Sequence, residues 1–345
     1  MPDLESLYTL HAYGKLSKVR FAASQQAYDS RITLFATGTW DEKKNNALTL
    51  WKLEEIPISL RNLVPFSYEN KIIAKVDHKG DVRDMQFIGD SFLLTSSSKG
   101  CLNVFNCIKS ERQTEHETDF ENKSAAATGM AIKPFGSPDT EIASVGEDGR
   151  LVLFKITDQN HYQVVDDADA SGLRAVSWPS SDRIITAGSS GQLRIFDYRN
   201  PNKPCAKFYD SAHPRDSLNC LKVNSSQVHQ IVSGSSQGFV TIWDTRNLSR
   251  PEKQSHPHKN SGIAVYLYIS LAVLSCSEDG TIGIMDFNAH AENLRHHGSL
   301  RDSILIRKLG SGFNNLAINS IDYHPVARLL IGGGDSQNLL LKELE

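Results

Sequence analysis

The sequence predicts an all-β protein, a seven-bladed β-propeller, and three observations lead to this prediction. A short pattern recurs about every 48 residues along the chain, a spacing typical of propeller blades. Alternating apolar segments flank each copy, as expected for half-buried strands. No segment has the periodicity of a long amphipathic helix. One such unit cannot bury both faces of its sheet, so the units are expected to stack radially in a ring.

The recurring pattern is a glycine followed by aliphatic residues at the second and fourth succeeding positions, and the weaker copies have another residue in place of the glycine. The five strongest copies begin at Gly100, Gly149, Gly191, Gly238 and Gly280, and two weaker copies begin at Asn46 and Gln337. An aromatic residue fills the fifth position in most copies. These predicted blade aromatics are Trp51, Phe105, Phe154, Phe196 and Trp243.

Each copy lies in a predicted unit of three strands, and the glycine marks the turn between the second and third. A fourth, outer strand is expected before the next unit begins, and segments 71–78 and 304–309 fit this position. Residues 1–345 then form a single propeller domain, with loop insertions at 108–126 and 288–303.

The two ends of the chain are expected to complete one blade together. The last unit stops just after its third strand, so its outer strand is missing. The N-terminal segment 4–12 precedes the first strand of the first unit. We therefore expect this N-terminal strand to pair onto the last blade and to close the ring.

Composition and charge exclude several classes of protein. The net charge is −3 and the pI about 6.5, whereas a nucleic-acid-binding surface would be basic. The sequence has no run of 18 apolar residues, so no membrane span is expected. Five scattered cysteines form neither a zinc pattern nor a disulfide framework, which indicates a reducing compartment, the cytosol or the nucleus.

Two acidic turns raise the question of chemistry, because Asp148 and Asp279 each follow a glutamate and precede a glycine. Neither turn has the converging oxygen ligands of a calcium loop, and adjacent carboxylates cannot flank one glycosidic bond. We interpret both as hairpin turns between strands. The pairs His256/His258 and His296/His297 lack further zinc ligands nearby and are interpreted as surface-loop histidines. We predict no catalytic residue, cofactor or metal.

Two copies end in IFDYR (195–199) and IWDTR (242–246), and with them the chain resembles the WD40 repeat family over nearly its whole length. The resemblance implies a hydrogen-bonded tetrad of His, Ser or Thr, Asp and Trp in each blade. Here the tetrad is fragmentary. The matching residues are His78 and Ser96 in the second unit, His213, Ser233 and Trp243 in the fifth, and His258 and Asp279 in the sixth.

Segments 35–51, 78–87 and 141–154 further resemble the family of forty-three-kilodalton nucleoporins, and 166–176 and 189–199 continue the likeness. This resemblance implies a non-enzymatic scaffold subunit of the Y-shaped outer-ring complex of the nuclear pore. It implies α-helical nucleoporins as partners, nucleocytoplasmic and mRNA transport as the process, and location at the nuclear envelope. It also implies a mitotic kinetochore pool. The residues that would contact a partner are not predicted.

Two other classes of function are weighed against the scaffold. The endings at Phe196–Arg199 and Trp243–Arg246 resemble the motif by which WD40 substrate receptors dock on a cullin–RING ubiquitin ligase. An enzyme would need a cluster of ionisable residues in the central channel or on the top face. Because the inward-facing positions of the third strands are aliphatic, no such cluster is expected.

Overall fold

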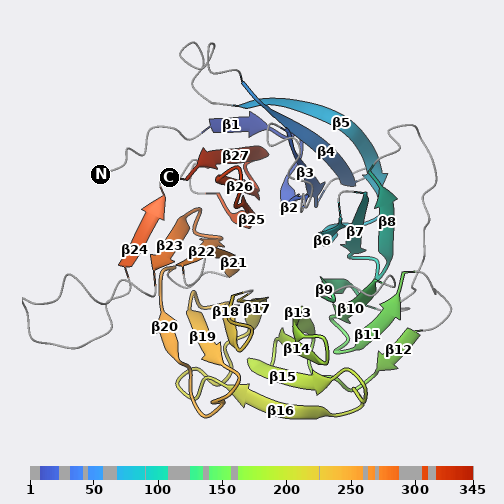
Figure 1. Ribbon diagram of the computed structural model, residues 1–345, viewed down its shortest axis with the longest axis vertical. Coiled ribbons are helices and arrows are strands. Elements are labelled where there is room, and N and C mark those ends of the chain that lie inside the picture. The colour runs from blue at the N-terminus through green and yellow to red at the C-terminus, as the bar shows by residue number, and fades with distance from the viewer. Residues whose placement is uncertain are drawn as a thin grey trace, which may run out of the picture.

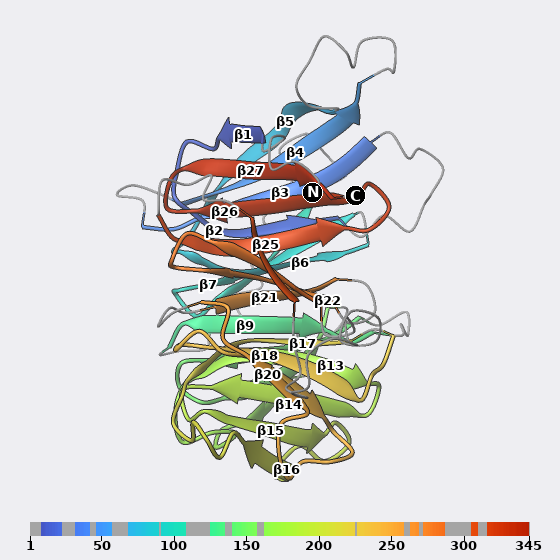
Figure 2. The same ribbon diagram turned by 90° about the vertical axis from the view of Figure 1, so that its left-hand side faces the viewer.

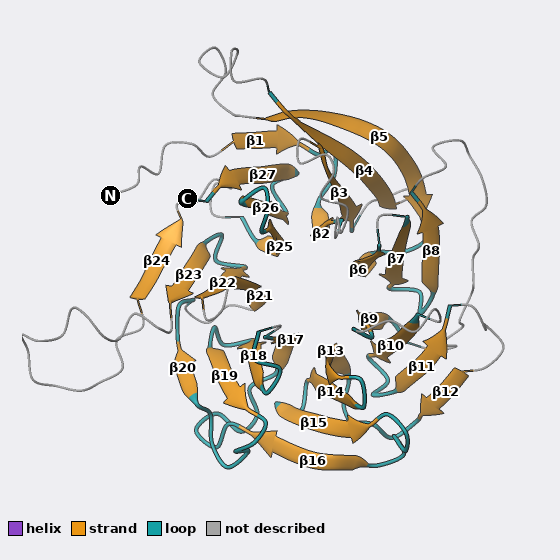
Figure 3. Cartoon of the chain, viewed as in Figure 1, coloured by secondary structure: helices purple, strands orange, loops and turns teal. Residues whose placement is uncertain are grey.

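The computed structural model shows seven antiparallel sheets arranged radially around a central channel (Figure 1). Six sheets have four described strands each, and one sheet has three. The described residues contain strands, turns and bends but no helix that could cross a membrane (Figure 3). The structure describes residues 8–22, 32–41, 46–56, 68–89, 91–107, 125–134, 140–156, 162–224, 226–258, 263–268, 272–286, 305–309 and 316–344.

The sheets are numbered here in chain order, and each runs from an innermost strand at the channel to an outer strand at the rim (Figure 1). The first has β2 (Leu16–Phe21), β3 (Ile32–Thr39), β4 (Asn46–Glu55) and β5 (Tyr68–His78), and the second has β6 (Val82–Ile88), β7 (Phe92–Ser97) and β8 (Leu102–Asn106). The third has β9 (Ala127–Ile132), β10 (Glu141–Gly146), β11 (Leu151–Lys155) and β12 (Tyr162–Val165), and the fourth has β13 (Leu173–Ser180), β14 (Arg183–Gly188), β15 (Gln192–Asp197) and β16 (Pro204–Tyr209). The fifth has β17 (Leu218–Val223), β18 (Gln230–Ser235), β19 (Val240–Asp244) and β20 (Lys253–Ser255), and the sixth has β21 (Ile263–Tyr268), β22 (Ala272–Ser277), β23 (Ile282–Asp286) and β24 (Leu305–Leu309). The seventh has β25 (Ile318–His324), β26 (Leu329–Gly334), β27 (Asn338–Glu343) and β1 (Tyr8–His11).

The predicted all-β propeller is confirmed by this architecture. The two predicted outer strands also form, since 71–78 lies within β5 and 304–309 overlaps β24. Viewed from the side, the sheets stack into a disc with loops on both faces (Figure 2). Most of the predicted insertion 108–126 and all of 288–303 lie outside the described residues.

The recurring glycines are the residues that reverse the chain between the second and third strands. All five strong anchors have positive φ, from 71° to 95°, and Gln337 of the weak seventh copy has φ 59°. At Gly149, a Cβ atom would lie 2.1 Å from the carbonyl oxygen of Asp169. The repeat is therefore set by a backbone conformation that glycine adopts without strain, and at Gly149 also by a close approach of the next loop.

Successive side chains of a third strand point to opposite faces of the sheet, so each third strand packs against both neighbouring sheets. In β11, Leu151 and Leu153 join a core cluster with Trp178 of the fourth sheet. Val152 and Phe154, which point to the opposite face, join a cluster that includes residues of the second sheet. The other predicted blade aromatics are also buried, except Phe105, which is partly buried. Trp51, for example, stacks on Phe35 with the ring planes 3° apart.

The N-terminal strand lies on the outer edge of the seventh sheet. Tyr8–His11 pair antiparallel with Asn338–Leu341 of β27, so residues from the two ends of the chain share one sheet. Ala12 N–H adds a hydrogen bond to the carbonyl of Gln337 (2.8 Å). Leu10 and Tyr8 pack against a buried cluster formed by residues of the first and seventh sheets. This contact joins the first and last repeats of the chain.

Deleting residues 1–12 should lower the melting temperature by several degrees, because β1 and its apolar contacts would be lost. Deleting only residues 1–7 leaves β1 whole and is the matched control. Differential scanning calorimetry of the three proteins makes the comparison. Equal melting temperatures for the full chain and the 1–12 deletion would show that β1 does not stabilise the ring.

Candidate functional site

Each tetrad-like group ties the loop before a sheet to its inner strands. In the sixth sheet, His258 is fully buried and its Nδ1–H donates to the Asp279 carboxylate at 3.0 Å. Its Nε2 lies 2.8 Å from Ser275 Oγ and accepts from that hydroxyl. His258 is therefore not the surface-loop histidine of our interpretation. His256, which is exposed, stacks on Phe239 instead.

In the second sheet, the structure replaces one predicted residue with its neighbour. His78 Nε2 lies 3.1 Å from Thr95 Oγ1, whereas the predicted partner Ser96 has a buried hydroxyl with no hydrogen-bond partner among the described residues. Successive residues of a strand point to opposite faces, so a one-residue error selects the wrong side chain. The Nδ1–H of His78 donates to the Gly80 carbonyl (2.9 Å), which fixes the neutral tautomer.

In the fifth sheet, the structure brings only two of the three predicted residues together. Trp243 Nε1–H donates to Ser233 Oγ (2.9 Å). His213 lies in the preceding loop, where its Nδ1 is 2.7 Å from Asp210 and its ring lies 4.2 Å from that of Phe239, tilted by 33°. The residue that ties this loop to the sheet is Asp216, which accepts hydrogen bonds from the hydroxyl of Ser236 and the amide of Gln237.

The fourth sheet contains a group that the sequence reasoning missed. Asp169 is buried and accepts from Ser190 Oγ (2.7 Å), and Arg194 forms an ion pair with it at 3.1 Å. Asp169 and Asp216 both stand a few residues before an innermost strand, where the family has histidine. A search for acidic residues at this position would have found both.

The acidic turn at Asp148 has the local geometry expected of a hairpin. Asp148 Oδ1 accepts from the Arg150 amide at 3.1 Å, and Gly149 N–H donates to the Gly146 carbonyl. Asp279 acts in the same way on the Thr281 amide (2.9 Å). Among the described residues no group of three or more His, Cys, Asp or Glu side chains could hold a metal ion.

In each ending that resembles a ligase-docking motif, the arginine forms an ion pair with the aspartate two residues before it. Arg246 Nη2 lies 2.6 Å from Asp244 Oδ2, and Arg199 Nη2 lies 2.8 Å from Asp197 Oδ2. Hydrogen bonds from the arginines hold the pKa of each carboxyl at about 2. Both arginines are well exposed, so the pairs do not brace neighbouring sheets.

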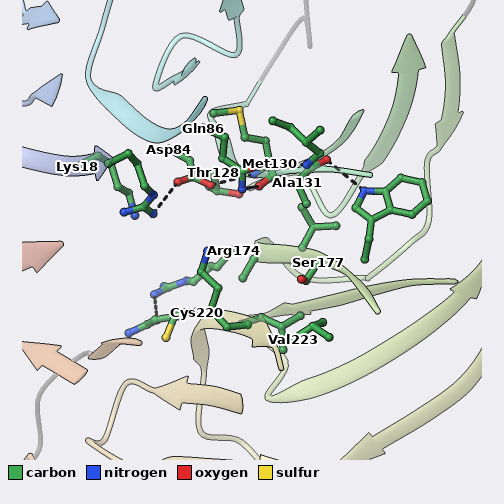
Figure 4. Close-up of a pocket in the computed structure, with 18 of the residues that line it drawn as sticks. Lys18, Asp84, Gln86, Thr128, Met130, Ala131, Arg174, Ser177, Cys220 and Val223 are labelled. Atoms are coloured by element: carbon green, nitrogen blue, oxygen red, sulfur yellow. Dashed lines mark hydrogen bonds and ion pairs between the residues drawn. The ribbon is translucent and has the colours of Figure 1, made fainter. Parts of the chain in front are cut away.

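The central channel holds a cluster of ionisable side chains, which corrects our expectation that it would hold none. It is lined by the innermost strands, whereas the expectation was drawn from the third strands. A cavity of about 350 Å³ opens there (Figure 4). Its ionisable lining residues are Lys18, Arg20, Asp84, Arg174 and Lys222, with Cys220 beside them.

Side chains of the innermost strands bind the next sheet around much of this channel, and we call this set the channel belt. Its members are Ser320, Asp322, Arg20, Asp84, Gln86, Thr128, Arg174 and Asn219. Asp322 accepts from the Phe21 amide (2.7 Å), which links β25 to β2. Arg20 then reaches Asp84 of β6 at 3.3 Å.

The belt continues from β6 through β9 and β13 to β17. Asp84 Oδ2 accepts from the Met130 amide (3.2 Å), and Gln86 both accepts from the Ile132 amide and donates to the Met130 carbonyl. Thr128 donates to the Leu173 carbonyl (2.7 Å), and Arg174 donates to Asn219 Oδ1 (2.6 Å). Five consecutive sheet junctions are thus bridged by side chains.

Comparisons with known proteins agree with this geometry. A radial ring of antiparallel sheets defines a β-propeller, and its Trp–Ser and His–Asp bonds and Asp-x-Arg endings resemble those of WD40 repeats. No protein-family model matches the chain. It is 28% identical to nucleoporin Nup43 of Mus musculus over 325 residues, which covers 89% of this chain and 84% of the relative. It is 27% identical to nucleoporin Nup43 of Homo sapiens over 328 residues, covering 90% and 84%.

A third relative extends the likeness beyond animals. The nuclear pore complex protein NUP43 of Arabidopsis thaliana is 27% identical over 172 residues, or 42% of this chain and 48% of the relative. The chain is therefore homologous to nucleoporin Nup43, and with the two animal proteins the homology spans about nine-tenths of its length.

Replacing Asp148 with alanine should lower the free energy of unfolding by about 1 kcal/mol, because the Arg150 amide loses its acceptor. The exposed neighbour Glu147, changed to alanine, is the control and should leave stability unchanged. Chemical denaturation measures both. An effect of Glu147→Ala as large as that of Asp148→Ala would contradict the turn role.

Acidification should destabilise the protein through His78, because burial lowers the pKa of its imidazole below the usual 6.5. Below pH 6.5 the unfolded chain binds a proton that the folded chain does not, so stability is intact above this pH and falls below it. His78→Gln should flatten the fall in unfolding free energy between pH 7 and the folded pKa. The exposed His256→Gln is the control, and an equal slope in His78→Gln and wild type would refute the assignment.

Proposed function

We propose that this chain is a non-enzymatic scaffold subunit of the nuclear pore complex. The observation that supports this most is the homology to nucleoporin Nup43 over about nine-tenths of the chain. A ring whose sheets are joined by buried clusters and by the channel belt presents a rigid disc to protein partners. Fold alone does not give function, so the homology determines which assembly is proposed.

The finer parts of the proposal come from the family resemblance. They are membership of the Y-shaped outer ring, docking on an α-helical nucleoporin, a role in nucleocytoplasmic and mRNA transport, and residence at the nuclear envelope. The kinetochore pool in mitosis stays a prediction of the same resemblance.

The outer strand β5 is the surface that best suits a protein partner. It is 11 residues long and lies at the rim, on the outer edge of the first sheet (Figure 1). Ile72, Ile73 and Val76 on it are 41%, 36% and 41% exposed. Three exposed aliphatic side chains within five residues make this part of the rim apolar, and exposed apolar surface of this kind marks protein interaction sites. The apolar face of an amphipathic helix of the partner would pack against these side chains.

A second candidate, a substrate receptor of a cullin–RING ligase, is favoured by one observation. The side chains of Arg199 and Arg246 are 72% and 67% exposed beside their paired aspartates. Both follow third strands of neighbouring sheets, so they lie on the same face of the disc. An adaptor could engage them there.

Affinity purification from cells, using the full chain with a small tag, tests the proposal. Helical nucleoporins should co-purify. Recovery of a cullin adaptor that is lost when Arg199 and Arg246 are changed to alanine would support the second candidate and overturn the first.

Changing Ile72 and Val76 together to glutamate should reduce recovery of the nucleoporin partner by about tenfold, because charges would replace an apolar anchor. The double variant should keep the wild-type melting temperature, since both side chains are exposed. Val326→Glu, which changes a valine that is 71% exposed, is the matched control. Unchanged recovery with the β5 variant would place the docking surface elsewhere, while loss of all nucleoporins from wild type would refute the scaffold role itself.

A further inference from the structure

The cavity in the central channel has the size of a small-ligand site. Its volume is about 350 Å³, near the lower end of the range for ligand pockets. Residues of β2, β6, β9, β13, β17 and β25 line it, so it lies on the propeller axis (Figure 1). The close-up shows Lys18 and Asp84 on one side and Arg174 and Cys220 on another (Figure 4).

The charge of this cavity is unbalanced. Four basic side chains line it, against a single carboxylate, that of Asp84. The Asp84 oxygens already accept hydrogen bonds from Arg20 and from the amides of Met85 and Met130. The carboxylate is thus committed to holding β2, β6 and β9 together. Its negative charge also acts on Lys18 and Lys222, but one carboxylate can balance only one of the four cations.

Two of the cations are Lys18 and Lys222, which make no hydrogen bond or ion pair with any residue that the structure describes. Asp84 attracts both amines from a distance and Asp322 attracts Lys222, but neither carboxylate is hydrogen-bonded to a lysine, and that of Asp322 accepts from the Phe21 amide. The side chains of β21 are not described, yet its sequence IAVYLY contains no acidic residue. No innermost strand other than β6 and β25 has a carboxylate to offer.

Burial lowers the pKa of both amines, while Asp84 opposes this effect and Arg20 adds to it. A lysine that is removed from water without a partner is costly, and a bound anion offsets that cost. The cavity therefore has an excess of positive charge, which a bound anion would balance. This charge lies in a confined space that weakens screening by salt.

We infer that the central channel binds a small multivalent oxyanion of the phosphate class, with Lys18 and Lys222 as its principal ligands and Arg174 at its margin. Lysine ammonium groups are compact charges that bind phosphate oxygens well. All the uncommitted polar groups named here are N–H donors, which suits an acceptor-only ligand. The small volume favours an ion over a peptide. This site goes beyond the scaffold role and does not depend on it.

Isothermal titration of the full chain with pyrophosphate, in a buffer free of phosphate and sulfate, tests the inference. Saturable binding with a dissociation constant below about 1 mM is expected. The double variant Lys18→Met/Lys222→Met should bind at least tenfold more weakly. Lys203→Met/Lys207→Met removes the same charge from exposed positions outside the cavity and should bind as wild type does.

Thermal unfolding supplies a second measurement that does not need the titration. Without anion, the channel variant should melt at or above the wild-type temperature, because an unpaired lysine has been replaced by an apolar side chain. Pyrophosphate should raise the melting temperature of the wild type but not of the channel variant.

Inorganic phosphate and pyrophosphate, compared with chloride at equal ionic strength, separate a phosphate site from general screening. If chloride has the same effect, or if the channel and exposed-lysine variants lose binding equally, the inference is overturned. The same holds if wild type shows no saturable binding. If the channel variant fails to fold, Lys222→Gln alone should still weaken pyrophosphate binding, and unaltered binding by that variant would refute the site.

Discussion

The ring depends on hydrogen bonds that cross from the innermost strand of one sheet to the backbone of the next. An innermost strand has a sheet partner on only one side, so the amides and carbonyls on its other edge need acceptors and donors from elsewhere. Asp322, Asp84 and Gln86 provide acceptors for amides of β2 and β9. Apolar clusters hold neighbouring sheets face to face, while these bonds fix their register at the axis, where the sheets converge.

Different residues in different sheets form the hydrogen bonds that hold the loop before each innermost strand. A loop must be fastened to the inner strands before each sheet begins. His258 does this with Asp279 and Ser275, whereas Asp169 does it with Ser190 and Arg194. A buried histidine and a buried aspartate both reach two partners at once, which is what the position requires. A repeat that lacks the histidine can therefore still have a hydrogen-bonded link between this loop and the inner strands.

The fold could be predicted from the sequence because its signals are local. A positive φ at Gly149 or Gly238, followed by alternating aliphatic residues, is specific for the hairpin that every unit contains. The channel could not be predicted in this way. Irregular pairing interrupts the innermost strands between Leu16 and Lys18 and between Val82 and Asp84, and it recurs at the same place in four other sheets. Such bulges turn side chains away from the face that simple alternation assigns.

The distribution of charge links the channel to the stability of the ring. The whole chain carries a net charge of −3, yet the seven innermost strands contain five lysines and arginines, namely Lys18, Arg20, Arg83, Arg174 and Lys222, against Asp84 and Asp322. Closing the ring brings four of these cations to one cavity, where they repel each other. A sequence selected for stability alone would place apolar residues there, as it does along the third strands. Retaining cations that oppose closure is the pattern expected where a site serves something other than the fold.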